Sequence, residues 1–371
     1  MRFVLAAALA LGLAVPAAAQ QRYPSSAGEL AIETVASGLE HPWGLAFLPD
    51  GRMLVTERPG RLRLVGSDGK LSAPISGVPN VVARGQGGLL DVVLDPNFAQ
   101  NRYLYLSFAE PRANGNGTSV ARARLSAHGN ALEGLSVIFR QMPTIASNMH
   151  FGSRLVFDRA GALFVTVGDR YSQRDQAQNP ENHIGKVLRI RPEGGAADGN
   201  PRKPGWQPEI WSIGHRNVQG AALHPQTGQL WTAEHGARGG DEINAPKAGR
   251  NYGWPVITYG IDYSGVKIGE GTSKPGMEQP LFYWDPSIAP SGAAFYTGAA
   301  WPAWKNSLFV GALAGQLLAR LSTDGEKVTG EERLLSNLGE RIRDVRQGPD
   351  GFLYLLTDDS SGKILRLRPA R

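Results

Sequence analysis

Several polar side chains that could do chemistry stand directly before apolar runs. One of them is His150, which lies in "NMHFGSRLVF" (148–157) in a chain that has only 7 histidines. A histidine at this position has two interpretations. It is either a structural residue that caps the strand and hydrogen-bonds a neighbouring loop, as most single histidines are, or a titratable imidazole that takes part in a reaction.

Other polar residues occupy equivalent places. They are Gln86, the run His215-Arg216-Asn217 in "GHRNVQG" (214–220), and the pair Arg341 and Arg343 in "RIRDV" (341–345). Three long polar groups rarely stand together at the start of a buried strand without partners, so the run at 215–217 indicates a site. The two arginines, taken alone, would be interpreted as part of a surface strand.

A glycine-rich loop, "EHGARGGDEINAPKAGRNYGWP" (234–255), is also informative. Three glycines within 236–240 let carbonyl oxygens turn inward, and Asp241 and Glu242 add carboxylates. Oxygen-rich ligation suits Ca²⁺, which takes about six to eight oxygen ligands. The competing interpretation is a solvated acidic turn.

The elements that must position these residues are repeated. Six stretches each consist of a short apolar strand, a turn rich in Asp, Gly, Pro or Asn, and a second apolar strand: 44–57, 89–108, 153–169, 219–235, 291–313 and 343–359. Turn chemistry of this kind between apolar runs predicts hairpins.

A second repeated unit follows most of these hairpins: "GRLRLV" (60–65), "ARARLS" (121–126), "KVLRIR" (186–191), "LARLST" (318–323) and "KILRLR" (363–368). Basic and apolar residues alternate with period two, as in a strand with one buried face. We therefore expect the arginines of these strands on solvated outer faces.

Six such units with no useful helical periodicity predict an all-β protein, a six-bladed β-propeller. A β-sandwich does not explain six copies, and a β-helix needs much shorter repeats. Uneven spacing predicts insertions, mainly at 110–150 and 236–290, on the face that carries the site. Equivalent ends of radially arranged strands converge on one axis, so the polar residues are expected to meet in one pocket.

Composition and charge exclude several classes of protein. With no cysteine, the chain has no disulfide, thiolate metal site or thiol nucleophile. Its formal net charge of +6 is spread along the chain, which argues against nucleic-acid binding and favours an acidic small ligand held by a few arginines. The common catalytic signatures of hydrolases, zinc proteases and nucleotide-binding proteins are missing.

The first residues have the pattern of a secretory signal peptide. Residues 1–20 contain Arg2, an apolar core at 3–15 and small residues at 17–19, and the apolar run is too short to span a bilayer. We expect residues 21–371 to form a single soluble propeller domain, periplasmic or secreted, with no membrane span.

From about Gly38 to Pro369 the chain resembles the soluble, propeller-type sugar dehydrogenases that use pyrroloquinoline quinone (PQQ), particularly their aldose-dehydrogenase branch. The resemblance is carried by "HPWGLAFLPDG", "GQGGLLDVVLDPNF", "HFGSRLVFDRAGALFVTVGD", "GHRNVQGAALHP", "EHGARGGDEIN", "NYGWP", "APSG" and "RIRDVRQGPDG". These motifs are long and ordered along the whole chain, so the match is specific.

The resemblance implies a role for each matching residue. His150 would be the base that takes the proton of the anomeric hydroxyl, while Arg216 and Asn217 would face the quinone carbonyl where negative charge develops. Residues Gln86, Arg341 and Arg343 would hold the cofactor, the arginines through its carboxylates. The carbonyls of Gly236 and Ala237 would bind a Ca²⁺ that polarises PQQ, with Asp241, Glu242 and Tyr252 near a second, structural Ca²⁺. The partners would be an aldose and an external electron acceptor, a quinone or redox protein.

Two positions depart from the family pattern. Met149 stands where some members have an acidic residue, which predicts the loss of an orienting partner for His150. Ala314, in "GALAGQ" (311–316), stands where they have a lysine, which removes one cation from the cofactor. Both departures fit the aldose branch.

Two other functions are compatible with a propeller. A Ca²⁺-dependent lactonase would hold its metal with side-chain carboxylates at the channel centre and would not need Arg216, Arg341 and Arg343 together. A non-catalytic binding propeller would leave the cluster of His150 and Arg216 unexplained.

Overall fold

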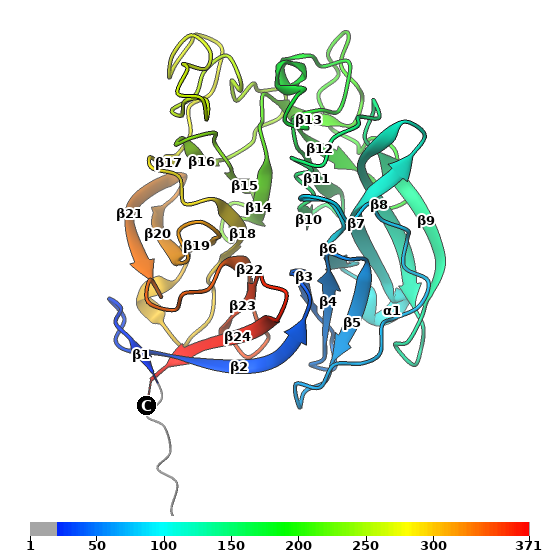
Figure 1. Ribbon diagram of the computed structural model, residues 1–371, viewed down its shortest axis with the longest axis vertical. Helices are drawn as coiled ribbons and strands as arrows, with labels where there is room; N and C mark the ends of the chain where they lie inside the picture. Colours follow the sequence, from blue (N-terminus) through cyan, green and yellow to red (C-terminus); the bar gives the residue numbers. More distant parts are fainter. Residues whose placement is uncertain (1–20, 371) are drawn as a thin grey trace, which may run out of the picture.

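Six antiparallel sheets surround a central axis, as Figure 1 shows for the computed structural model. The structure describes residues 21–370, so the expected signal peptide at 1–20 lies outside the described residues. Within the described range, no helix is long and apolar enough to cross a membrane. The predicted all-β, six-bladed propeller is confirmed.

The strands of each sheet follow one another from the axis outwards. The first sheet contains β3 (Pro42–Phe47), β4 (Met53–Glu57) and β5 (Arg61–Val65), and the second β6 (Leu89–Leu94), β7 (Tyr103–Arg112), β8 (Gly115–Leu125) and β9 (Leu132–Arg140). The third contains β10 (Leu155–Phe157), β11 (Leu163–Val167), β12 (Lys186–Ile190) and β13 (Ile210–Ile213), and the fourth β14 (Val218–Leu223), β15 (Leu230–Glu234), β16 (Asp241–Asn244) and β17 (Phe282–Trp284). The fifth contains β18 (Pro290–Phe295), β19 (Leu308–Ala312), β20 (Leu318–Asp324) and β21 (Lys327–Leu334), and the sixth β22 (Ile342–Gln347), β23 (Leu353–Thr357), β24 (Gly362–Pro369), β2 (Leu30–Leu39) and β1 (Arg22–Tyr23). Three short helices, α1 (Phe98–Asn101), η1 (Arg174–Gln178) and η2 (Pro302–Trp304), lie between strands.

The innermost strand of each sheet contacts the innermost strand of the next, in the order β3, β6, β10, β14, β18, β22 and back to β3. The hydrophobic core lies between neighbouring sheets. One cluster, for example, joins Leu54 and Leu62 of the first sheet to Leu104 and Ala121 of the second. Burying both faces of the sheets explains why the second strands, such as β11 and β19, are apolar and wholly buried.

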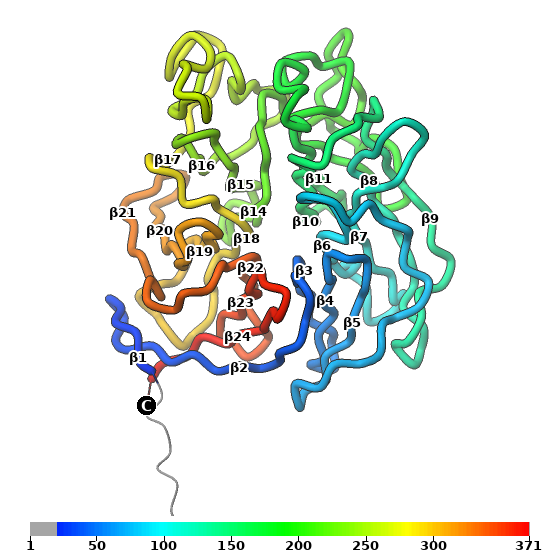
Figure 2. Tube along the Cα trace, viewed as in Figure 1, coloured from blue at the N-terminus to red at the C-terminus, as the bar shows by residue number. Residues whose placement is uncertain are grey.

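Two distant parts of the chain close the ring. The strand β2 pairs antiparallel with β24, from Leu30 opposite Pro369 to Leu39 opposite Gly362. Figure 2 shows the blue and red segments side by side. The sixth sheet therefore combines the two ends of the described chain and closes the ring.

The axis is filled by an ionic network. The Nη1 atom of Arg154 lies 3.0 Å from Asp91 and 3.1 Å from Asp344, and Arg346 lies 2.8 Å from each of the same two aspartates. The two arginines and two aspartates belong to the second, third and sixth sheets or their immediate flanks, so opposite sides of the ring are tied together at its centre.

The predicted hairpins form the first two strands of all six sheets, and the second repeated units coincide with third strands. One expected insertion was wrong: most of 110–150 forms the end of β7, β8 and β9, and the longest segment outside the strands is the one after β9, from residue 141 on. The expectation of solvated arginines is confirmed for some residues, such as Arg124 and Arg191, which are exposed. It was wrong for Arg189 and Arg320, which are only 11% and 12% exposed and pair with Asp158 and Glu332.

Candidate active site

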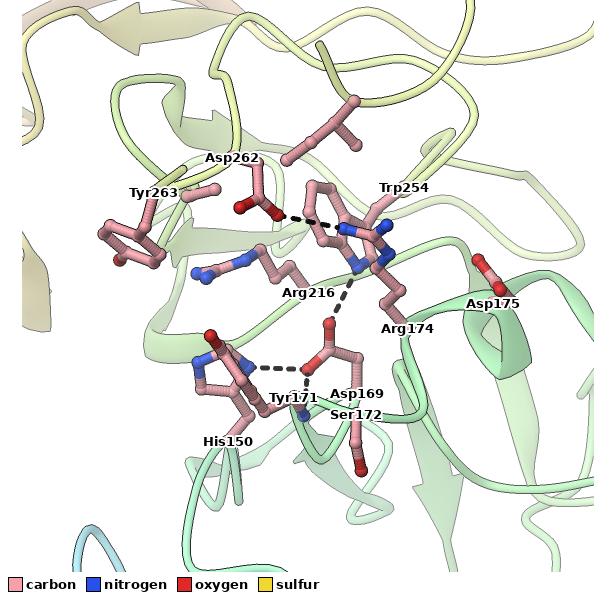
Figure 3. Close-up of a pocket in the computed structure, with 12 residues that line it drawn as sticks. His150, Asp169, Tyr171, Ser172, Arg174, Asp175, Arg216, Trp254, Asp262 and Tyr263 are labelled. Atoms are coloured by element: carbon pink, nitrogen blue, oxygen red, sulfur yellow. Dashed lines mark hydrogen bonds and ion pairs between the residues drawn. The ribbon is translucent and has the colours of Figure 1, made fainter. Parts of the chain in front are cut away.

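A cavity of about 380 Å³ opens where the β10 end, the β11–β12 loop and the β16–β17 insertion meet (Figure 3). Polar and aromatic side chains line it: His150, Asp169, Tyr171, Ser172, Arg174, Asp175, Arg216, Trp254, Asp262 and Tyr263, with Ala237 and Ile268. The β16–β17 connection, 245–281, is the second expected insertion, and it supplies one wall.

The imidazole of His150 is held by a carboxylate that the sequence reasoning missed. Its Nδ1 atom lies 2.6 Å from Oδ1 of Asp169, which also accepts the Tyr171 N–H at 2.8 Å. The other oxygen of Asp169 accepts the indole N–H of Trp254 at 2.8 Å. With Nδ1 engaged, the tautomer is fixed and Nε2 is the ring atom left to accept a proton.

The backbone around His150 adopts left-handed conformations, which cost energy in non-glycine residues. His150 has φ 52° and Ser153 φ 85°, while Arg170 and Tyr171 across the hairpin have φ 57° and 64°. The N–H of His150 donates to Oε1 of Gln86 at 2.9 Å. The first strands of the second and third sheets therefore fix the histidine together.

Burial lowers the pKa of His150 below its ordinary value of 6.5. The hydrogen bond and charge of Asp169 oppose this shift, whereas the positive charges of Arg216 and Arg170 add to it. A buried imidazole with a lowered pKa is neutral at pH 7 and able to accept a proton.

The expectation from Met149, that His150 lacks an orienting partner, was therefore wrong. Met149 is 43% exposed, whereas Asp169 is buried and supplies the partner from β11's end. The register of the β10–β11 hairpin explains why Asp169 reaches His150. Leu155 lies opposite Val165, so the residues before β10 lie close to those after β11.

Arg216 and Asn217 lie on either side of this base. The buried guanidinium of Arg216 donates to the carbonyl oxygens of His235, at 3.1 Å, and Gly236, and it lies 5.3 Å from the Trp254 ring. The Oδ1 atom of Asn217 accepts the Gly152 N–H at 3.1 Å. Of the predicted site residues, His150, Arg216 and Ala237 line the cavity itself, with Gln86 and Asn217 bonded to the backbone at 150–152.

Arg341 and Arg343 form a separate group around Asp358 and do not line the cavity. Arg343 donates to Asp358 at 2.7 Å and to the Gln219 side chain at 2.8 Å, and its buried Nε has no hydrogen-bond partner. Arg341 is half exposed and donates to the Leu313 carbonyl at 3.2 Å. Free guanidinium N–H groups near the axis fit a planar ligand that carries carboxylates.

The loop expected to bind Ca²⁺ contains both engaged and unengaged oxygens. Asp241 is buried rather than solvated, and its oxygens accept from the side chain of Ser287 and three backbone N–H groups. The Tyr252 hydroxyl donates to the Ala245 carbonyl and accepts the Lys247 N–H. The side chains of Asp241 and Tyr252 thus shape the loop and are not free for a metal.

Glu242 is the residue whose chemistry fits a cation. Burial, together with the charges of Glu234 and Asp241, raises its pKa to about 8. Glu234 lies directly opposite on β15, and the nearby Asn244 has a buried Oδ1 without a hydrogen-bond partner. Among residues 21–370, no cluster of three His, Cys, Asp or Glu side chains could hold a metal, so ligation here requires amide or carbonyl oxygens as well.

The chain belongs to the Glucose / Sorbosone dehydrogenase family, whose model matches residues 39–366. It is 50% identical over 344 residues to the Aldose sugar dehydrogenase YliI of Escherichia coli (strain K12), covering 91% of this chain and 92% of that protein. A solved structure described as glucose dehydrogenase shares 53% identity with a TM-score of 0.89, over 92% of this chain and all of that one. The PQQ-bound form of Aldose Sugar Dehydrogenase from Streptomyces coelicolor shares 29% identity with a TM-score of 0.77, over 91% and 98% of the two chains.

Proposed function

We propose that this protein is a PQQ- and Ca²⁺-dependent dehydrogenase that oxidises aldose sugars at C1 to the lactone and passes the electrons to an external acceptor. The observation that carries the proposal is the neutral, buried His150, oriented by Asp169, on the wall of a cavity that also contains Arg216. The family and its PQQ-bound relative support the choice of cofactor.

The oxidation removes one proton and one hydride from the sugar. Nε2 of His150 accepts the proton of the anomeric hydroxyl as the C1–H bond breaks and C1 becomes the lactone carbonyl carbon. PQQ, when bound, is the oxidant that takes the hydride. Asp169 stabilises the imidazolium that forms, and the Trp254 N–H keeps the carboxylate in place.

The cations of the site suit an oxidant that gains negative charge. Arg216 is held at the cavity by the carbonyls of residues 235 and 236 and would bring a positive charge to the place where negative charge develops. Asn217 would face the same part of the cofactor. Gln86, Arg341 and Arg343 would bind the rest of it, the arginines through its carboxylates.

Two Ca²⁺ ions are part of the proposal. The carbonyls of Gly236 and Ala237 would hold the ion next to the cofactor, which requires the Arg216 guanidinium to move from the Gly236 carbonyl towards the cofactor. Glu242 would hold a structural ion with neighbouring oxygens. The tight turn explains the glycine at 236, since a Cβ there would lie 2.3 Å from the carbonyl oxygens of Gly239 and Gly240.

The alternative functions explain the structure less well. A lactonase-type propeller requires carboxylates at the channel centre, but Asp91 and Asp344 are both paired with Arg154 and Arg346. A non-catalytic propeller has no use for an oriented, neutral histidine in a cavity. The expected export of the protein is in keeping with an acceptor outside the cytoplasm, a quinone or redox protein.

Reconstitution tests the proposal. Apoprotein supplied with PQQ and Ca²⁺ is expected to reduce a redox dye when an aldose is added, and to do so only when both are present. Lactone hydrolysis without PQQ would instead support the lactonase, and the absence of both activities would support a binding protein.

A further inference from the structure

Three arginines gather around a single carboxylate between the first and sixth sheets. Arg343 lies 2.7 Å from Oδ2 of Asp358, Arg341 lies 3.9 Å from the same atom, and His41 lies 2.9 Å from Oδ1. The third arginine is Arg58, which follows β4 directly.

Positive charge exceeds negative charge in this group. Three guanidinium ions interact with one aspartate, whose Oδ1 atom also binds an imidazole. The pKa of Arg58 is lowered by burial and by the charges of Arg343 and Arg341, while Asp358 offsets only part of this. A partly buried surplus of cations is unfavourable unless an anion joins it.

The contacts of Arg58 place it at the proposed cofactor site. It donates to the carbonyl of Gly85, and the next residue, Gln86, accepts the N–H of His150. The Nε atoms of Arg58 and Arg343 are both buried without a hydrogen-bond partner. Arg58 therefore contacts the turn that holds the base, interacts with the two predicted cofactor arginines, and has donor capacity left over.

We infer that Arg58 is a third cofactor-binding cation, which pairs with a carboxylate of the anionic cofactor alongside Arg341 and Arg343. This inference rests on the proposed function. PQQ is a tricarboxylate, so one of its carboxylates would neutralise the surplus positive charge of the arginines. A purely structural role, in which Arg58 only ties β4 to the 85–88 turn, predicts a loss of stability without a change in ligand affinity.

The test is a PQQ titration of apoprotein in excess Ca²⁺, followed by equilibrium dialysis rather than by activity. We expect Arg58→Ala to raise Kd by about tenfold to about a hundredfold, as the loss of one charge-assisted contact does, and Arg343→Ala to do the same. Arg58→Lys should lose less. The matched control is Arg52→Ala in the turn directly before β4, where the arginine forms a surface pair with Asp50, and its Kd should not change.

A second variant distinguishes binding from folding. Position 314 is exposed and follows the carbonyl that accepts from Arg341, so Ala314→Lys brings an ammonium group to the same cluster. Added to Arg58→Ala, it should restore much of the PQQ affinity. The inference would be overturned if Arg58→Ala bound PQQ with the same Kd as wild type. It would also be overturned if Arg58→Ala bound PQQ more weakly and the added Ala314→Lys did not improve the binding. If wild type itself binds no PQQ, the proposed function fails first.

Discussion

In the proposed reaction, His150 and Asp169 act as a pair. Burial keeps the imidazole neutral, and the carboxylate presents it in one tautomer. The backbone next to both residues is strained. The hydrogen bonds of His150 with Gln86 and of Asp169 with Trp254 compensate for this strain, as expected where strain serves a function.

The pH dependence follows from the state of His150. The base acts only when neutral, and its pKa lies below the ordinary 6.5, so kcat/KM should rise with pH through an inflection below 6.5 and stay level at neutral pH. A pH profile of the reconstituted enzyme measures this. An inflection clearly above 6.5 would show that the imidazole is not in the environment described.

Replacing Asp169 should impair the base without removing it. Asp169→Asn loses the charge that favours the imidazolium and can present the wrong tautomer, so kcat should fall by about tenfold to about 10⁴-fold. The inflection in the pH profile should also move to lower pH, since Asp169 raises the pKa of His150. Asp175→Asn, which lines the same cavity without contacting His150, is the control and should leave both unchanged.

The β15–β16 hairpin and its turn bring carboxylates close together. Glu234 and Glu242 face each other across the hairpin, an arrangement that is unfavourable when both are ionised and no cation is present. A bound Ca²⁺ would offset the repulsion between the two carboxylates. Because the ion binds only the folded protein, it would raise the free energy of unfolding.

Chelation should therefore lower the Tm of the protein even without PQQ. At a Ca²⁺ concentration 100 times Kd the ion contributes about 2.7 kcal/mol. In excess Ca²⁺, Glu242→Gln should already show this loss and should not respond to chelator, whereas His150→Ala should melt like wild type. Melting curves that are the same for wild type with and without chelator would refute a structural Ca²⁺.

The ring as a whole depends on its axis as well as on its closure by β2 and β24. Arg154 is buried and bonded to Asp91 and Asp344, which come from sheets on different sides. Removing one member of such a network leaves an uncompensated buried charge, which costs more than a surface pair is worth.

Arg154→Met should accordingly lower the free energy of unfolding by about 3–5 kcal/mol. Arg52→Ala, which breaks an exposed pair, should change it by less than about 1 kcal/mol. Denaturant unfolding measures the change in the free energy of unfolding for each variant. Equal values for the two variants would mean that the axial network does not hold the sheets together.

The repeated hairpins made the propeller predictable, because period-two patterns and turn residues are local features of the sequence. The same dependence on local patterns caused the errors in predicting insertions and site residues. The first part of β8, "GNGTSV" (115–120), looked like an insertion because it has no apolar alternation. Asp169 and Arg58 were missed because their roles depend on interactions across a hairpin or between sheets, such as the charge interaction of Arg58 with Asp358, 300 residues away.

The central claim is that His150 is the base of a PQQ-dependent sugar oxidation, and a single-turnover experiment tests it most directly. Wild type and His150→Ala are loaded with PQQ and Ca²⁺, shown by dialysis to bind PQQ equally, and mixed with an aldose in the absence of oxygen while the PQQ absorbance is followed. We predict rapid reduction of PQQ in wild type and a rate lower by about 10² to 10⁴ in His150→Ala. Equal rates in the two proteins, or no reduction in wild type, would contradict the account.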